Sequence, residues 1–262
     1  MTTGPPGFPL PNFSTDLSGQ VALVTGASSG LGRRFATVLA TCGAQVAATA
    51  RRVKRLEELA DEIRAAGGMC LPLPLDVTDA DQFAPAVDRI EAELGPVSLL
   101  VNNAGMPDAQ YATRMSTALV DDVIGTNLRG PFLLACEVAR RLIERKAPGR
   151  VVNLSSMGAH HYAGGGAALY SITKAAVERM TEALAVEWAR FGINVNAIAP
   201  GAFASEMMDG MLARVGDFTK LFPRQRLGDP AQLDSTLLYF VSPSSEFVTG
   251  MIAKVDDGQG PR

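Results

Sequence analysis

The stretch from Asn153 to Lys174, NLSSMGAHHYAGGGAALYSITK, brings together side chains that can exchange protons with a ligand. It contains serines, tyrosines, a lysine and the only two histidines of the chain. Histidine is the usual proton carrier near neutral pH. Tyr170 and Lys174, however, are four residues apart and share a face if the segment is helical. The stretch therefore offers two alternative sets of acid/base groups.

The tyrosine–lysine pair can do acid/base chemistry only if the pKa of the phenol falls. A phenol has a pKa of about 10 in water, and exchange near neutrality needs a drop of roughly three units, or about 4 kcal/mol. A nearby ammonium, together with a bound oxidised nicotinamide, favours the phenolate in a partly dry pocket, because Coulomb interactions strengthen as the dielectric constant falls. We therefore expect Lys174 to lower the pKa of Tyr170, although such pairs are also common on helix surfaces.

The two histidines have no third His, Cys or acidic residue at metal-ligand spacing, so we expect no metal site. They follow a predicted strand, at the sheet edge where open α/β folds bind ligands. We expect His161 or Tyr162 to line a substrate pocket. Exposure of both histidines, His160 included, as ordinary loop residues is the alternative.

The elements that must position these groups alternate between short apolar runs and longer amphipathic stretches. This alternation predicts an α/β fold, a single doubly wound domain with a parallel seven-stranded sheet and helices on both faces. The predicted strands are 20–25, 44–50, 70–75, 98–102, 150–155, 193–199 and 251–255, and the predicted helices are about 31–42, 53–66, 79–94, 116–146, 170–191 and 230–242.

Composition limits the possible partners and the domain plan. The chain has 262 residues, 47% of them hydrophobic, and a formal net charge of −3, with no long basic run that would favour nucleic acid. No apolar run is long enough to span a membrane, and the three scattered cysteines favour a reducing, cytoplasmic setting. We expect an irregular N-terminal arm over 1–17, a catalytic domain over 18–262, and a substrate loop at about 202–228.

A glycine-rich turn follows the first predicted strand and opens the first helix. Gly26, Gly30 and Gly32 lie in TGASSGLG, where the backbone can approach a ligand and the helix N-terminus offers free N–H groups to an anion. The pattern indicates a pyrophosphate site, and a tight turn without a ligand is the alternative.

The end of the second predicted strand indicates which dinucleotide fits. Ala50 stands where an acidic residue often binds the adenosine ribose, and Arg51 and Arg52 follow it. A guanidinium there favours a 2′-phosphate and hence NADP over NAD, although NAD remains possible and a solvated basic helix start is the alternative. Against NADP, Ser28 and Ser29 provide no second cation in the glycine loop.

Eight motifs occur in an order that resembles the short-chain dehydrogenase/reductase family. They are TGASSGLG (25–32), LDVTD (75–79), NNAG (102–105), GTNLRG (125–130), NLSS (153–156), YSITK (170–174), IAPG (198–201) and VDDG (255–258). The resemblance implies a Rossmann-like fold and hydride transfer between a nicotinamide and a secondary alcohol or ketone. It also implies a homotetramer or homodimer that assembles through helices about 116–146 and 170–191.

The resemblance implies a role for each catalytic residue. Tyr170 would be the acid/base, Lys174 would lower its pKa and bind ribose, and Ser156 would donate a hydrogen bond to the substrate oxygen. Asn127 would hold open a helix around a water that relays protons to Lys174. The family places its serine thirteen residues before the tyrosine, whereas Ser156 lies fourteen before Tyr170, so we expect an extra residue to bulge near 164–166.

The remaining predicted contacts follow from the same motifs. The cofactor set is Thr25, Gly26, Ser28, Ser29, Gly30, Leu31, Gly32, Arg51, Arg52, Asp76, Val77, Asn103, Ala104, Gly105, Tyr170, Lys174, Pro200, Gly201, Phe203 and Ser205. The substrate set is Met106, Met157, His161, Tyr162 and Met207.

The largely apolar, methionine-rich substrate set favours a medium-sized hydrophobic ketone or alcohol, with NADP(H) as the cofactor. Packing of these methionines in a short helix or against another subunit is the alternative reading. Arg224 and Arg226 leave open a 3-oxoacyl-thioester (acyl-carrier or CoA) reductase. A nicotinamide-binding sensor without catalysis is the alternative from another class.

Overall fold

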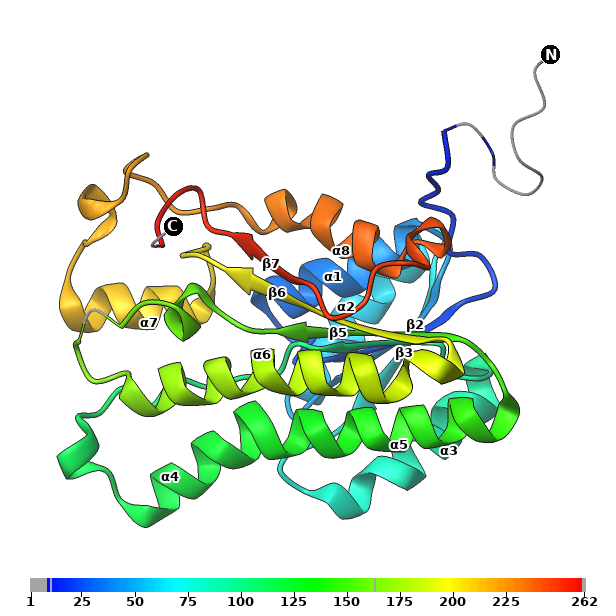
Figure 1. Ribbon diagram of the computed structural model, residues 1–262, viewed down its shortest axis with the longest axis horizontal. Coiled ribbons are helices and arrows are strands. Elements are labelled where there is room, and N and C mark those ends of the chain that lie inside the picture. The colour runs from blue at the N-terminus through cyan, green and yellow to red at the C-terminus, as the bar shows by residue number, and fades with distance from the viewer. Residues whose placement is uncertain (1–8, 10, 163, 261–262) are drawn as a thin grey trace.

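The computed structural model describes residues 9, 11–162 and 164–260. Within this part of the chain, seven parallel strands form one sheet in the order β3-β2-β1-β4-β5-β6-β7 (Figure 1). The strands are β1 (Val21–Thr25), β2 (Gln45–Ala50), β3 (Met69–Pro74), β4 (Leu99–Asn102), β5 (Gly149–Leu154), β6 (Ile193–Pro200) and β7 (Ile252–Val255). The α-helices are α1 (Gly30–Thr41), α2 (Val53–Ala65), α3 (Phe83–Leu94), α4 (Thr117–Ile124), α5 (Gly130–Arg145), α6 (Ala168–Trp188), α7 (Glu206–Val215) and α8 (Asp234–Val241).

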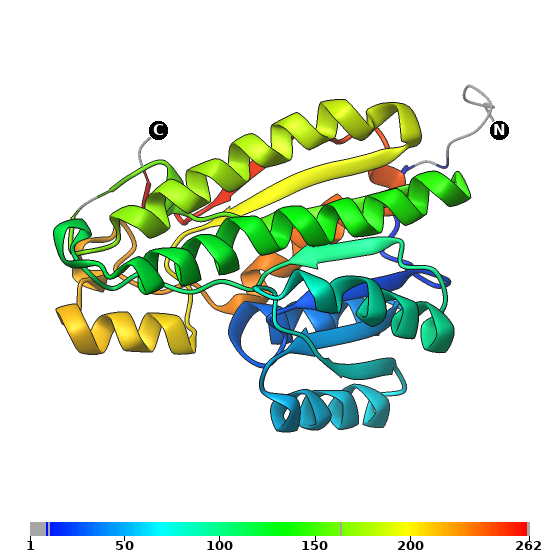
Figure 2. The same cartoon turned by 90° about the horizontal axis from the view of Figure 1, so that it is seen from below.

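The central strands β1, β4, β5 and β6 are buried along almost their whole length because helices cover both faces of the sheet. One core cluster joins the sheet to α1, α2 and α8, and the other joins it to α3, α5 and α6. Figure 2 shows α5 and α6 running side by side along the second face. Fully covered parallel strands need no polar alternation. The predicted doubly wound α/β fold is therefore confirmed.

The reversal of strand order lies between β1 and β4, which pair in parallel with Val24 opposite Val101. At such a switch point the loops after the two strands turn to opposite faces and leave a crevice at their carboxyl ends. The glycine loop follows β1 and the NNAG segment follows β4. The topology thus brings these two motifs together.

Two helical predictions differ from the structure. The predicted helix 116–146 is divided into α4 and α5 by a π-helical turn at Gly125–Arg129, where an extra residue per turn widens the helix. Residues 206–215, predicted as part of a loop, form α7, which lies beyond the carboxyl ends of the strands (gold in Figure 1). No residue of α7 is buried, so it has no apolar stripe in the core that would predict it.

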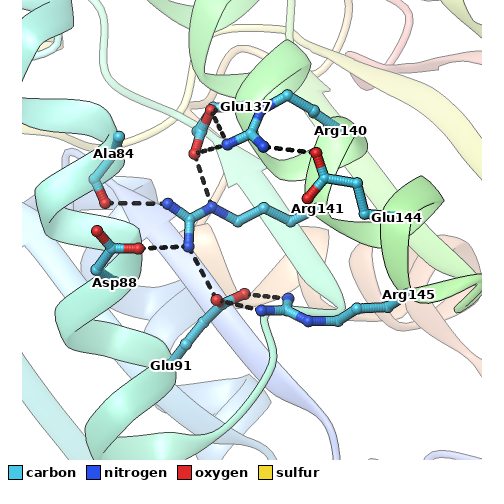
Figure 3. Close-up of polar contacts among 8 residues, drawn as sticks. All are labelled: Ala84, Asp88, Glu91, Glu137, Arg140, Arg141, Glu144 and Arg145. Atoms are coloured by element: carbon cyan, nitrogen blue, oxygen red, sulfur yellow. Dashed lines mark hydrogen bonds and ion pairs between the residues drawn. The ribbon is translucent and has the colours of Figure 1, made fainter.

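An ion-pair network joins α3 to α5 (Figure 3). Arg141, whose side chain is only 12% exposed, donates to Asp88 at 2.6 Å, to Glu91 at 3.0 Å and to Glu137 at 2.6 Å. Burial opposes ionisation of Glu91, but hydrogen bonds from Arg145 and Arg141 hold its pKa below the ordinary value. Loss of one partner would leave a charge poorly compensated, so the network fixes how the two helices pack.

The described residues 11–17 form no helix or strand. They lie against the domain: the amide of buried Leu17 donates to the carbonyl of Cys42 at 2.8 Å, and Ser242 donates to the carbonyl of Ser14 at 2.6 Å. Residues 1–8 and 10 of the predicted arm lie outside the described residues. Among the helices that the structure describes, none has both the length and the apolar character required to cross a bilayer.

Candidate active site

The glycine loop is fixed by Thr25 and Asn103. The Thr25 hydroxyl accepts hydrogen bonds from the amides of Asn103 and Ala104 at 3.0 and 3.1 Å. The Asn103 side-chain amide donates to the carbonyls of Thr25 and Gly26 at 3.0 and 3.3 Å. A Cβ on Gly32 would lie 2.3 Å from Nδ2 of Asn103, so only glycine fits there. The side chains of Thr25 and Asn103 thus shape the loop, and a direct cofactor contact of either one stays a prediction.

The start of α1 is suited to an anion. Ser29 is its N-cap residue, yet the Ser29 hydroxyl makes no capping hydrogen bond and instead accepts from Arg52 at 2.6 Å. The first-turn N–H groups therefore lack a side-chain cap, and the helix dipole adds partial positive charge. Gly30 has a φ of 53°, a left-handed conformation that glycine adopts readily. Leu31, next along, packs against the core. This arrangement fits the predicted pyrophosphate site.

The adenosine side of the crevice holds the predicted arginines and Asp76. The Arg51 side chain is 77% exposed and lies 4.0 Å from the Asp76 carboxylate. Burial raises the pKa of Asp76, but hydrogen bonds from Thr78 and the charge of Arg51 lower it more, so its pKa lies below the ordinary value. The carbonyl of buried Val77 lies so close to Gly130 that a Cβ on that glycine would be 2.1 Å away. These contacts fix the β3 end against the start of α5.

Tyr170 and Ser156 face each other across Gly158. Ser156 ends the segment after β5 and accepts the amide of Gly158 at 3.0 Å. A Cβ on Gly158 would lie 3.4 Å from the Ser156 oxygen and 3.6 Å from Cε1 of Tyr170. Ser171 donates to the Gly158 carbonyl at 2.6 Å, which ties this turn to α6. The serine and the tyrosine predicted to act together are therefore adjacent.

Lys174 and Asn127 complete the group from the other side. The buried Lys174 ammonium donates to the Leu154 carbonyl at 2.7 Å and lies 5.6 Å from the centre of the Tyr170 ring. A Cβ on Gly105 would lie 3.5 Å from both the Lys174 nitrogen and the Asn127 side-chain oxygen. Asn127, in the π-helical turn, exchanges hydrogen bonds with the backbone of Met106 at 2.8 and 2.9 Å. All four predicted catalytic residues thus surround one end of the crevice.

The electrostatics differ from our expectation for Tyr170. Burial raises the pKa of the phenol, a hydrogen bond with Ser156 lowers it, and the charge of Asp108 raises it, so that the net direction is upward. Burial also lowers the pKa of Lys174 to about 8. In the described residues on their own the pKa of the phenol is not lowered, because the ammonium is directed to the Leu154 carbonyl and burial dominates. Lowering by Lys174 together with a bound oxidised nicotinamide stays a prediction.

Asp108 is a site residue that the sequence did not reveal. Its buried carboxylate accepts the amides of Leu169 and Tyr170 at 2.9 and 3.0 Å, and so caps the first turn of α6. Ala167, the N-cap residue in sequence, has no side chain that could do this. The cap comes from a loop some 60 residues earlier, and no local motif indicates such a long-range contact.

The segment after β6 occupies the far side of the crevice. Pro200 ends β6, and the Gly201 amide donates to the Val255 carbonyl at 2.9 Å. Phe203 is buried with its ring against Gly228, in the core rather than on an open surface. Ser205 caps α7 by accepting the Met208 amide at 3.2 Å, and a Cβ on Gly30 would lie 3.4 Å from its Cβ. Ser205 therefore lies over the glycine loop.

The predicted substrate residues are spread around the same end. Met106 and Met157 are half-buried, whereas Tyr162, His161 and Met207 are exposed. His160 approaches Glu178 at 3.0 Å, and Ser155 also donates to Glu178, at 2.7 Å. Gly164, Gly165 and Gly166, where the bulge is predicted, all have positive φ. Across the described part of the chain, no group of three His, Cys, Asp or Glu side chains could hold a metal ion.

Comparison with known proteins shows which family this chain belongs to. A family model described as short chain dehydrogenase matches residues 20–215. The chain belongs to the short-chain dehydrogenase/reductase family. Like other members of that family, it is an NAD(P)-dependent oxidoreductase that acts on CH–OH groups.

Relatives of this short-chain dehydrogenase/reductase cover nearly all of it. Gluconate 5-dehydrogenase of Gluconobacter oxydans is 36% identical over 246 residues, which are 92% of this chain and 95% of that one. A short-chain type dehydrogenase/reductase from Mycobacterium marinum superimposes with a TM-score of 0.90 at 35% identity, over 94% and 97% of the two chains. A putative NAD(P) dependent gluconate 5-dehydrogenase from Beutenbergia cavernae, with bound NADP at low occupancy, superimposes with a TM-score of 0.87 at 32% identity. The match covers 94% of this chain and 99% of that one.

The position of Tyr170 predicts the effect of its removal. Tyr170→Phe deletes the proton donor while keeping the ring, so we expect kcat to fall by roughly 10²- to 10⁴-fold. His161→Ala changes an exposed residue and should alter KM or substrate choice with turnover retained. Steady-state kinetics on both variants checks this. If His161→Ala were inactive while Tyr170→Phe kept its activity, the proton donor would be His161 and not Tyr170.

The Asp108 cap predicts two separable effects. Asp108→Ala removes the acceptor for two amides at the start of α6, so we expect a loss of about 1 kcal/mol in unfolding free energy and a lower kcat. Asp108→Asn keeps an acceptor but removes the charge that raises the pKa of Tyr170, so the rise of the alcohol oxidation rate with pH should move to lower pH. Asp122→Asn, at an exposed position of α4, is the control. An unmoved pH profile in Asp108→Asn would refute the electrostatic role.

Proposed function

We propose that this enzyme transfers hydride reversibly between NADP(H) and a secondary alcohol or ketone at the crevice beside Tyr170. The observation that carries the proposal is the convergence of Ser156, Tyr170, Lys174 and Asn127 at the end of a crevice whose other end has an uncapped helix N-terminus. The nicotinamide supplies the hydride when it is bound. Side chains of this protein bind the reactants, transfer the proton and stabilise the charge that develops on the substrate oxygen.

Tyr170 holds the proton that moves. In reduction its hydroxyl protonates the new alkoxide, and in oxidation the phenolate removes the alcohol proton. Ser156 donates a hydrogen bond to the substrate oxygen as charge develops on it, which stabilises that charge in a partly dry site. Because the Tyr170 pKa is raised in the structure, its neutral acid form is the one present near neutral pH.

Lys174 supplies positive charge and a ribose contact beside the phenol. Its buried amine keeps a proton against a burial penalty that lowers its pKa to about 8, with the Leu154 carbonyl as acceptor. Asn127 holds the Met106 backbone and the π-helical turn in place on the same side. We infer that a proton-relay water binds between Asn127 and Lys174, beside Gly105, where the two polar groups converge.

The arginines after β2 support NADP over NAD. Arg51 is exposed beside the crevice, and Arg52 donates to both serines of the glycine loop, at 3.1 Å to Ser28 and 2.6 Å to Ser29. A guanidinium binds a phosphate with paired, charge-assisted hydrogen bonds. The solved relative from Beutenbergia cavernae, which has NADP bound at low occupancy, is in line with this preference.

For the substrate we propose a medium-sized ketone or secondary alcohol with an apolar body. Met106 and Met157, which are half-buried, and the exposed Met207 would provide flexible, polarisable contacts for such a substrate. A second candidate is a hydroxylated sugar acid, because the similar enzyme of Gluconobacter oxydans is a gluconate 5-dehydrogenase. The 3-oxoacyl-thioester alternative is less favoured, since Arg224 and Arg226 both pair with Asp257.

A panel of carbonyl substrates tests the proposed function. We expect NADPH consumption with at least one of an apolar ketone such as 2-octanone, 5-ketogluconate, or a 3-oxoacyl-CoA, with a higher kcat/KM for NADPH than for NADH. Absorbance at the nicotinamide band follows the reaction, and Tyr170→Phe is the control. Tight NADPH binding with no turnover of any substrate would instead support a non-catalytic sensor.

We further propose that the enzyme assembles as a homotetramer or homodimer through α5 and α6. The two helices lie side by side, and Phe132, Ile172 and Val186 are 41%, 63% and 82% exposed on them. Large apolar side chains exposed on long helices favour a protein interface where they share one surface.

The interface predicts a change in assembly on substitution. Ile172→Asp together with Val186→Asp should reduce the mass measured by sedimentation to that of one chain or half an assembly. Val53→Asp, at a residue 39% exposed on α2, is the matched control. A wild-type protein that sediments as a single chain would contradict the proposal.

A further inference from the structure

A carboxylate from the substrate loop occupies the arginines at the cofactor pocket. The Arg52 guanidinium donates to Glu206 at 2.9 Å while its other nitrogens bind the two serines of the glycine loop. Arg55, one turn into α2, pairs with the other oxygen of the same carboxylate. Glu206 thus bridges two cations that belong to the cofactor-binding side of the enzyme.

Glu206 reaches this position from the start of α7, on the other side of the crevice. It follows Ser205, which lies over Gly30 of the glycine loop. Together with Ser28, Ser29, Gly30 and Arg55 it lines an open hollow of about 650 Å³. Hydrogen bonds from Arg52 and Arg55 hold the pKa of Glu206 at about 2, so the carboxylate is charged near neutral pH.

The position of the Glu206 carboxylate affects which dinucleotide the arginines can bind. A guanidinium has a limited set of in-plane donors, and those of Arg52 are divided among two hydroxyls and Glu206. A 2′-phosphate beside the glycine loop would meet the negative charge of Glu206 and compete with it for the same donors. A 2′-hydroxyl carries no charge and would not compete.

We propose that Glu206 is a specificity-determining residue that competes with the 2′-phosphate of NADP for Arg52 and Arg55 and so reduces the preference of this enzyme for NADP over NAD. The inference rests on the proposed function in that it takes the hollow beside Arg52 as the 2′-phosphate end of the dinucleotide site. When a 2′-phosphate binds, the first turn of α7 loses its two ion pairs to α2. Cofactor choice is thereby coupled to the helix that forms part of the substrate loop.

Arg51 provides the competing explanation. Its side chain is largely exposed, and its nearest carboxylate, Asp76, lies 4.0 Å away. If Arg51 alone bound the 2′-phosphate, Glu206 would not affect the choice of dinucleotide. Substitution of Glu206 separates the two arrangements.

The test compares Glu206→Gln with Asp209→Asn, an exposed acid one turn along the same helix. Dissociation constants are measured by calorimetry for NADP⁺ and NAD⁺, and for adenosine 2′,5′-bisphosphate and adenosine 5′-phosphate as minimal probes. We expect Glu206→Gln to bind NADP⁺ and the bisphosphate about fivefold more tightly, the scale of an exposed ion pair, with NAD⁺ and adenosine 5′-phosphate unchanged. Asp209→Asn should change none of the four. The difference should shrink as ionic strength rises.

Three outcomes would overturn the proposal. An unchanged ratio of NADP⁺ to NAD⁺ affinity would assign the phosphate to Arg51, and weaker NADP⁺ binding would mean that Glu206 organises the arginines instead of competing. If the enzyme still reduces ketones, either result contradicts the role proposed for Glu206 and leaves the proposed function intact. Failure of the wild-type protein to bind either dinucleotide would defeat the proposed function and the inference together.

Discussion

A buried ammonium needs partners, and the arrangement of this active site depends on how that of Lys174 is held. Its charge is 2.7 Å from the Leu154 carbonyl at the end of β5, with the Tyr170 ring one helical turn away. This contact anchors α6 to the sheet edge where the dinucleotide crevice opens. Burial disfavours the charged form of Lys174 and therefore lowers its pKa. The same burial raises the pKa of the neighbouring phenol, so one dry pocket sets both protonation states.

The surrounding elements serve this pocket by close packing rather than by many direct contacts. Thr25 and Asn103 cross-link the loops after β1 and β4, and Gly32 allows the two to approach within a distance that excludes any side chain. Gly158 and Ser171 hold the segment after β5 against α6 in the same way. Asp108, farther along the loop after β4, fixes the first turn of α6. Three loops from three strands therefore determine where a single hydroxyl points.

The sequence predicts the fold, and it predicts that Ser156, Tyr170 and Lys174 come together, because both depend on short-range patterns; their catalytic roles stay a proposal. Continuous apolar runs identify the covered parallel strands, and the four-residue spacing of Tyr170 and Lys174 places them on one face of α6. The glycine spacing after β1 indicates an anion site before any contact is known. The position of Ser156 next to Tyr170 also follows from the motif order, despite the one-residue difference in spacing.

What the sequence does not predict depends on contacts between distant segments. Glu206 and Arg52 are 154 residues apart, and neither segment alone indicates that they meet. Asp108 caps a helix from another loop, and α7 has no buried residue to mark it as a helix. The direction of the Tyr170 pKa shift in the protein without its dinucleotide is also not evident from the sequence. It depends on burial and on where the Lys174 ammonium points, which are properties of the folded chain.

The most direct test is a pH titration of the Tyr170 phenol itself. The ζ-carbon resonance, in protein labelled at tyrosine and assigned with Tyr170→Phe, reports its ionisation with and without NADP⁺. We expect a titration midpoint above the ordinary value of about 10 in the free enzyme, and a downward shift when the oxidised dinucleotide brings its positive charge into the crevice. An ordinary midpoint that the dinucleotide leaves unchanged would place the hydroxyl in solvent and contradict the proposed chemistry.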